Sequence, residues 1–176
     1  AVMEDADLDL AVSAALGGAY GGTGQKCTAS SRLVVHHAIH DAFVDKMIAG
    51  AKAMVVGHAL HEGTQIGPVV SAQQLQENLD YVALGQSEGA ELACGGARLE
   101  MPTEGFYMSP GLFIGSSNSM RINREEMFAP LAAVIKVGSY DEALHVVNDT
   151  NFGLTSGIVT KDLARATHFR QHAKTG

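Results

Sequence analysis

Apolar positions along the chain follow two spacings, one typical of helices and the other of buried strands. In residues 4–20 the apolar side chains recur every three or four positions, at Leu8, Ala11, Val12, Ala15, Leu16 and Ala19. This spacing places them on one face of an amphipathic helix. Residues 33–36 and 131–137 are instead short, mainly apolar runs, which predict buried strands, and another strand is expected at residues 154–160.

Local signals predict where further helices begin and end. Ser71 with Gln74, and Ser139 with Glu142, have the spacing of a capping box, so helices are expected from residues 72 and 140. Residues 39–51 and 162–173 also have helical apolar spacing, and glycines after residue 20 are expected to end the first helix. The residues expected to face the core from the later helices are Leu75, Leu79, Val82, Ala83, Ala143, Leu144, Val147, Leu163, Ala166 and Phe169.

Alternation of helices with strands predicts an α/β fold, built on a mainly parallel sheet with helices on both faces. Weaker strands are expected around residues 92–94 and 111–114, and residues 173–176 are expected to stop the last helix. No internal repeat or linker interrupts the pattern, so residues 1–176 are interpreted as one domain.

Composition narrows the function classes. The net charge of −7 disfavours a nucleic-acid partner, because phosphate binding needs clustered lysine and arginine. No apolar stretch of about 18 residues occurs and the first residues lack the pattern of a signal peptide, so no membrane association is expected. Two cysteines do not make a disulfide framework, which indicates a reducing, cytoplasmic setting.

Cys27 is the main candidate for chemistry. It follows a glycine-rich approach and precedes the apolar run at residues 33–36, where a sharp loop could expose a thiol nucleophile and its backbone N–H. A small buried side chain is the alternative for a lone cysteine, and it is the interpretation favoured for Cys94. The histidines at 36, 37, 40, 58 and 61 lack the spacing of a zinc helix, so no metal site is predicted.

Four blocks of the chain resemble segments of the aldehyde dehydrogenase superfamily, in the family's order. The first block resembles the family's cysteine signature and reads Tyr-Gly-Gly-Thr-Gly-Gln-Lys-Cys-Thr-Ala at 20–29. The second resembles the family's Glu-Glu-hydrophobe-Phe-Gly-Pro segment and reads Glu-Glu-Met-Phe-Ala-Pro at 125–130. Asn-Asp-Thr-Asn-Phe-Gly-Leu at 148–154, with Thr-Lys-Asp at 160–162, is similar to a third. Residues 3–8 match the approach to the cysteine helix. Ala129 replaces the family's glycine, which would cost about 1 kcal/mol if that position has a positive φ.

The resemblance implies a catalytic-domain type of fold and a role for each matching residue. Cys27 would add to an aldehyde, and the resulting thiohemiacetal would become a thioester as hydride passes to NAD or NADP. The Cys27 N–H would be one oxyanion donor. Glu126 would hold the nicotinamide ribose hydroxyls, and Phe128 would pack beside the nicotinamide. Gln74 would touch the adenosine ribose, unless its side chain turns back to the Ser71 cap.

The resemblance also implies that further parts of the enzyme lie outside this chain. In the family, the general base, the second oxyanion donor and most of the dinucleotide-binding domain precede the segment that starts at residue 1 here. The final catalytic segment and an oligomerisation strand follow residue 176. The chain is therefore expected to be an incomplete catalytic domain, inactive alone, from a parent that forms a homodimer or homotetramer and oxidises a small aldehyde. The cysteine block resembles the 2-oxoglutarate semialdehyde dehydrogenase branch more than others, which implies a semialdehyde substrate. A cysteine hydrolase and a non-catalytic relic of the fold are the alternatives.

Overall fold

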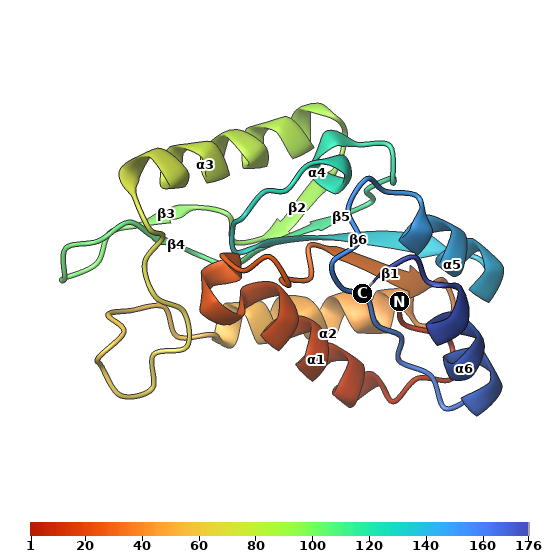
Figure 1. Cartoon of the computed structure of the whole chain (residues 1–176). Helices are drawn as coiled ribbons and strands as arrows, with labels where there is room; N and C mark the ends of the chain where they lie inside the picture. The colour runs from red at the N-terminus through yellow and green to blue at the C-terminus, as the bar shows by residue number, and fades with distance from the viewer. Residues whose placement is uncertain (176) are drawn as a thin grey trace.

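The computed structural model describes residues 1–175 and has a four-stranded mixed sheet at its centre (Figure 1). The strand order is β1 (Arg32–His36), β6 (Leu131–Val137), β5 (Gly111–Ile114) and β2 (Glu91–Cys94). β1, β6 and β5 are parallel, and β2 is antiparallel to β5 at one edge. The predicted mainly parallel sheet is therefore confirmed.

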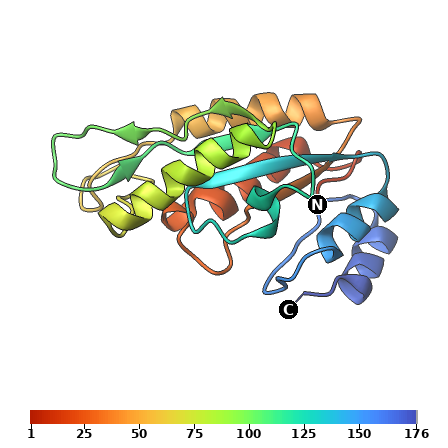
Figure 2. The same ribbon diagram turned by 90° about the horizontal axis from the view of Figure 1, so that it is seen from above.

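Helices cover both faces of this sheet, as the pattern predicted (Figures 1 and 2). One face packs against α1 (Leu8–Tyr20) and α2 (His40–Ala53). The opposite face packs against α3 (Ala72–Ser87) over β5 and against α5 (Tyr140–Asn148) over β1 and β6. The short α4 (Arg121–Arg124) lies beside α3, and α6 (Leu163–His172) joins the α5 side through buried Phe169.

The pleat of the strands explains why the sheet has hydrophobic cores on both of its faces. In β1, Leu33 and Val35 pack into the α1–α2 core while Val34 points to the α5 core. In β5, Leu112 faces α1 and α2 while Phe113 faces α3. Successive side chains of a strand point to opposite faces, so a strand covered on both sides must be apolar throughout.

The predicted first helix begins later than expected, at Leu8 rather than at residue 4. The Asp7 carboxylate accepts a hydrogen bond from Leu10 N at 3.1 Å and so caps the helix. Val2 lies against the sheet edge, where its N–H donates to Val34 O at 2.8 Å and its carbonyl accepts from His36 N at 2.9 Å. Asp5 instead accepts hydrogen bonds from Thr160 Oγ1 and Lys161 N.

The strand predicted at residues 154–160 is wrong. Only Val159 forms a bridge there, with Val2, and Leu154 is 53% exposed. The segment runs along the rim of a cleft, where Leu154 lies open, while Ile158 and Val159 pack against the cores from outside the sheet. Ala83 and Leu163, both expected in the core, are exposed, because the buried faces of α3 and α6 are turned away from them.

Four elements were not predicted. β3 (Arg98–Leu99) and β4 (Tyr107–Met108) form a small antiparallel ribbon, η1 (Gly21–Gly24) is a single turn after α1, and the fourth is the short α4. None of the helices within residues 1–175 has the length and apolar character needed to cross a membrane. Gly176, the last residue of the expected helix stop, lies outside the described residues.

Candidate active site

Three of the four sequence blocks converge on one cleft with a volume of about 690 Å³. One wall is the loop after α1, which carries Cys27. A second is the segment that follows α4, with Glu126 and Phe128, and a third is the stretch between α5 and α6, with Phe152. The fold therefore brings three of the predicted site residues, Cys27, Glu126 and Phe128, to the same cavity.

Cys27 sits on an exposed turn with an available backbone donor. The turn is closed by the Ala29 N–H, which donates to Lys26 O at 2.9 Å. The Cys27 thiol is exposed, and its N–H donates to no group among residues 1–175. A thiol and an unengaged N–H at one position fit nucleophilic attack on a carbonyl, in which the N–H meets the developing oxyanion.

Left-handed backbone shapes the approach to Cys27. Gly22, Thr23 and Gly24 have φ of 62°, 63° and 65°. This conformation is unusual for a β-branched residue such as Thr23, which is buried and donates from Oγ1 to Gly67 O at 3.2 Å. The next residue, Gln25, accepts from Val70 N at 3.0 Å. The loop is thus held from outside as well as by its own glycines.

Gly24 joins the Cys27 loop to the Glu126 segment. A Cβ on Gly24 would lie 1.9 Å from the Ala129 carbonyl oxygen and 2.9 Å from Pro130 N. Only glycine allows two backbones to approach so closely. The cost of about 1 kcal/mol considered for alanine at position 129 does not arise, because Ala129 does not have a positive φ. The preceding residue, Phe128, has the left-handed conformation instead, with φ of 52°.

The two adjacent carboxylates of this segment have different environments. Glu125 accepts from Arg121 Nε at 2.6 Å and from Tyr81 Oη at 3.1 Å, and the hydrogen bond from Arg121 lowers the pKa of its carboxyl. Glu126 is exposed on the cleft and has no hydrogen-bond or ion-pair partner among the described residues. A free carboxylate of this kind can accept two hydrogen bonds from a diol.

Gln74 lies outside the cleft wall. Only half of the expected capping box forms: Ser71 Oγ accepts from Gln74 N at 3.1 Å, while the Gln74 side chain donates to Asn78 Oδ1 at 2.9 Å. The side chain therefore does not turn back to the cap, and its amide oxygen remains available. A contact between Gln74 and the adenosine ribose stays a prediction.

The other candidates lie away from the cleft. Cys94 is buried in β2, as favoured from the sequence, and burial raises the pKa of its thiol. No histidine is among the described residues that line the cleft, and no group of three or more His, Cys, Asp or Glu side chains in residues 1–175 is arranged to hold a metal ion.

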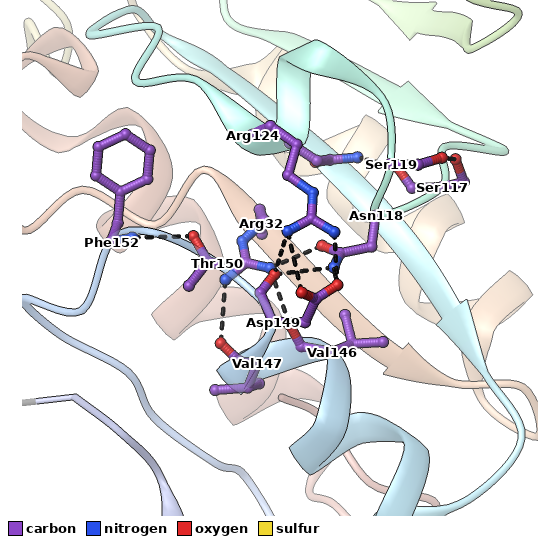
Figure 3. A network of polar contacts seen from close by, with 11 residues as sticks. Arg32, Ser117, Asn118, Ser119, Arg124, Val146, Val147, Asp149, Thr150 and Phe152 are labelled. Atoms are coloured by element: carbon purple, nitrogen blue, oxygen red, sulfur yellow. Dashed lines mark hydrogen bonds and ion pairs between the residues drawn. The ribbon is translucent and has the colours of Figure 1, made fainter.

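A polar network beside the cleft had no predicted role. It contains Arg32, Asn118, Arg124 and Asp149, which come from four separate parts of the chain (Figure 3). The one sequence signal for it is a charged residue, Arg32, directly before three buried apolar residues of β1.

Comparisons with known proteins agree with the geometry. The model of the aldehyde dehydrogenase family matches residues 1–176. The chain is 40% identical over 177 residues to alpha-ketoglutaric semialdehyde dehydrogenase of Bacillus subtilis, covering 99% of this chain and 36% of that protein. It is also 40% identical over 167 residues to betaine aldehyde dehydrogenase of Mesorhizobium japonicum, covering 94% and 34%.

Solved structures give the same result. The fold is similar to that of betaine aldehyde dehydrogenase from Staphylococcus aureus in complex with NAD+, with a TM-score of 0.97 and 33% identity. That match covers 99% of this chain and 35% of the Staphylococcus protein. The chain thus spans about a third of the length of the relatives that it matches.

Proposed function

The chain belongs to the aldehyde dehydrogenase family, and on this basis we propose that it forms the incomplete catalytic domain of a longer enzyme that oxidises an aldehyde to a carboxylic acid. The observation that carries the proposal is the meeting of Cys27, Glu126 and Phe128 on one cleft. The share of each relative that the chain covers, 36% for the Bacillus subtilis protein, supports the view that further domains complete the site.

Cys27 performs the covalent chemistry in this proposal. Its thiolate sulfur forms a bond to the aldehyde carbon, and the carbonyl oxygen becomes an oxyanion that accepts a hydrogen bond from the Cys27 N–H. Loss of hydride, with its two electrons, converts the thiohemiacetal into a thioester. Water then attacks the thioester carbon, which releases the carboxylic acid and returns the thiol. The base that activates this water is expected outside the chain.

Glu126 and Phe128 fit a nicotinamide coenzyme, NAD or NADP, which when bound would accept the hydride. Glu126 has no partner within residues 1–175 and is exposed to the cleft, which suits acceptance of hydrogen bonds from two ribose hydroxyls. Phe128 is 37% exposed on the same wall, so part of its ring is open to a flat ligand. The amide oxygen of Gln74 would accept from the adenosine ribose. The Staphylococcus relative was solved with NAD+.

The substrate proposed first is a small polar aldehyde of the semialdehyde class. Relatives named for alpha-ketoglutaric semialdehyde and for betaine aldehyde are equally similar to the chain, at 40% identity, so both belong in the first substrate panel. We further propose that the whole enzyme is a cytoplasmic homodimer or homotetramer.

A cysteine hydrolase is less well supported by the cleft. Such an enzyme needs a base beside the thiol, commonly histidine. No histidine within residues 1–175 lines the cleft. The difference can be tested, because a hydrolase would consume a thioester without producing NADH or NADPH.

Thiol labelling and coenzyme reduction test the proposal together. The full-length protein that carries this chain is treated with iodoacetamide, and the modified cysteines are identified by mass spectrometry over time. Cys27 should react at least about tenfold faster than Cys94, because Cys94 is buried and its raised pKa reduces the thiolate fraction. With 2-oxoglutarate semialdehyde or betaine aldehyde and NAD+ or NADP+, the protein should form the reduced coenzyme, and Cys27→Ser should not.

The matched control is Cys94→Ser, which should keep both the labelling of Cys27 and the formation of reduced coenzyme. Equal, slow labelling of both cysteines would favour the alternative that the chain keeps the fold without catalytic activity. Steady aldehyde oxidation by the 176-residue chain alone would refute the view that it is an incomplete domain.

A further inference from the structure

Arg124 and Asp149 form the centre of the polar network beside the cleft (Figure 3). Arg124 Nη2 donates to Asp149 Oδ2 at 2.5 Å, and Nη1 donates to Asp149 Oδ1 at 3.2 Å and to the Asp149 carbonyl at 2.8 Å. The guanidinium therefore binds both the carboxylate and the backbone carbonyl of Asp149. A two-point contact of this kind fixes orientation as well as distance.

Asn118 and Arg32 extend the network into the fold. The Asn118 amide donates to Asp149 Oδ2 at 2.8 Å and to the Asp149 carbonyl at 3.0 Å, and its oxygen accepts from Arg32 Nη1 at 2.8 Å. Arg32 also donates to the carbonyls of Val146 and Val147 at 3.0 and 3.2 Å. These carbonyls belong to the last turn of α5, where a cation is favoured by the helix dipole.

The charges of the network support one another. The hydrogen bond from Arg124 lowers the pKa of the Asp149 carboxyl, and the same hydrogen bond raises the pKa of the Arg124 guanidinium. Burial lowers the pKa of Arg32, as does the neighbouring charge of Arg124, while Asp149 opposes that change. Asp149 is thus the anion that two arginines share.

The ion pair of Arg124 and Asp149 lies next to the cleft. Neither Arg124 nor Asp149 is among the described residues that line it. Residues next to them in sequence do line the cleft. Glu125 and Glu126 lie on one wall, and Thr150 and Phe152 lie on another. The pair therefore links the two segments that form these walls, through residues directly next to the ones that line the cleft.

Glu126 is held by contacts on both preceding residues. Arg124 is tied to Asp149 on one side, and Glu125 is tied to Arg121 and Tyr81 on the other. With residues 124 and 125 both anchored, the backbone at Glu126 has little freedom to move, so the Glu126 side chain extends from a fixed point on the cleft wall.

We propose that Arg124 is a positioning residue for Glu126, and that its pairing with Asp149 sets the distance between the Glu126 wall and the wall that carries Phe152. This inference rests on the proposed function, in which Glu126 holds the nicotinamide ribose. Arg124 acts through the backbone and does not touch the reacting groups. Its loss affects coenzyme binding and leaves the Cys27 turn, which is held by Gly24, Thr23 and Gln25, unchanged.

The test uses the full-length protein with Arg124→Met, Arg124→Lys and Lys46→Met. Lys46 pairs with Asp9 at 2.6 Å on the exposed surface of α1 and α2, so it is the control for loss of an ion pair elsewhere. The readouts are KM for NAD+, KM for the aldehyde, and the rate at which iodoacetamide modifies Cys27.

Arg124→Met should raise KM for NAD+ by about tenfold, because small misplacement of a binding group is costly, while KM for the aldehyde and the labelling of Cys27 stay within about twofold. Arg124→Lys keeps the charge but loses the two-point contact, so it should recover part of the loss. Lys46→Met should match the unaltered protein in all three readouts.

Two results would overturn the inference while the unaltered enzyme is active. One is an unchanged KM for NAD+ in Arg124→Met. The other is a parallel fall in Cys27 labelling, which would show general damage to the fold. If the unaltered enzyme itself forms no reduced coenzyme with any aldehyde tested, the proposed function has failed instead.

Discussion

Replacing Gly24 with alanine perturbs the contact that joins the Cys27 loop to the Glu126 segment. Gly24 has φ of +65°, and a Cβ at this position would lie 1.9 Å from the Ala129 carbonyl oxygen and 2.5 Å from the Ala129 carbonyl carbon. Both atoms belong to backbone, which cannot rotate out of the way as a side chain can. The two segments must therefore move apart to admit the methyl group.

The magnitude has two parts. A left-handed alanine costs about 1–2 kcal/mol relative to glycine, and forcing an extra methyl group into a packed site costs about 1–3 kcal/mol more. The free energy of unfolding should therefore fall by about 2–5 kcal/mol. With a urea m-value of about 2 kcal/mol per molar, the midpoint of unfolding should fall by about 1–2.5 M.

Gly115→Ala is the matched control for the backbone part. Gly115 also has φ of +65°, but apart from its chain neighbours no heavy atom of the described residues lies within 4 Å of a Cβ built on it. Its substitution should cost only the left-handed part, about 1–2 kcal/mol. Urea unfolding of the 176-residue chain, followed by circular dichroism, measures both variants against the unaltered chain.

The comparison between the two variants refutes or supports the contact. Gly24→Ala should be less stable than Gly115→Ala by about 1–3 kcal/mol, the part that comes from steric overlap. If the two variants unfold at the same urea concentration, the close approach of Gly24 to Ala129 and Pro130 does not hold the loops together.

Two further predictions concern Asp149 and Gln74. Because the pKa of the Asp149 carboxyl is lowered in the fold, chiefly by the hydrogen bond from Arg124, its contribution to stability is present above the unfolded pKa of about 3.9 and is lost as the pH falls below it. The difference in unfolding free energy between the unaltered chain and Asp149→Asn should therefore be constant above about pH 5 and shrink towards pH 3; a difference that grows on acidification would contradict this sign. Gln74→Ala in the full-length protein should raise KM for NAD+ by about threefold, as expected for loss of one neutral hydrogen bond. Gln73→Ala, which removes only an exposed hydrogen bond to Glu77, should not change it; equal KM values for the two variants would remove Gln74 from the coenzyme site.

Much of the fold was predictable from sequence because its signals are local. The apolar run at residues 131–137 has the same bounds as β6, and Ser71 and Ser139 do cap α3 and α5. Periodicity reports which side chains one face must bury, and a capping side chain acts on the backbone three residues away. The same signals misplaced Leu163 and Ala83, because they do not say which side of a helix the rest of the chain will cover.

The candidate site divides in the same way. Short sequence blocks were enough to identify the residue types, which are a thiol after glycines at Cys27 and a carboxylate and a ring at Glu126 and Phe128. The fold was needed to show that the blocks share a cleft, that Gly24 contacts Ala129, and that Arg124 binds Asp149. These contacts are not local: Gly24 is far in sequence from the peptide that it touches, and Arg124 and Asp149 are 25 residues apart. Their contacts exist only after the sheet has placed β1, β6 and α5 side by side.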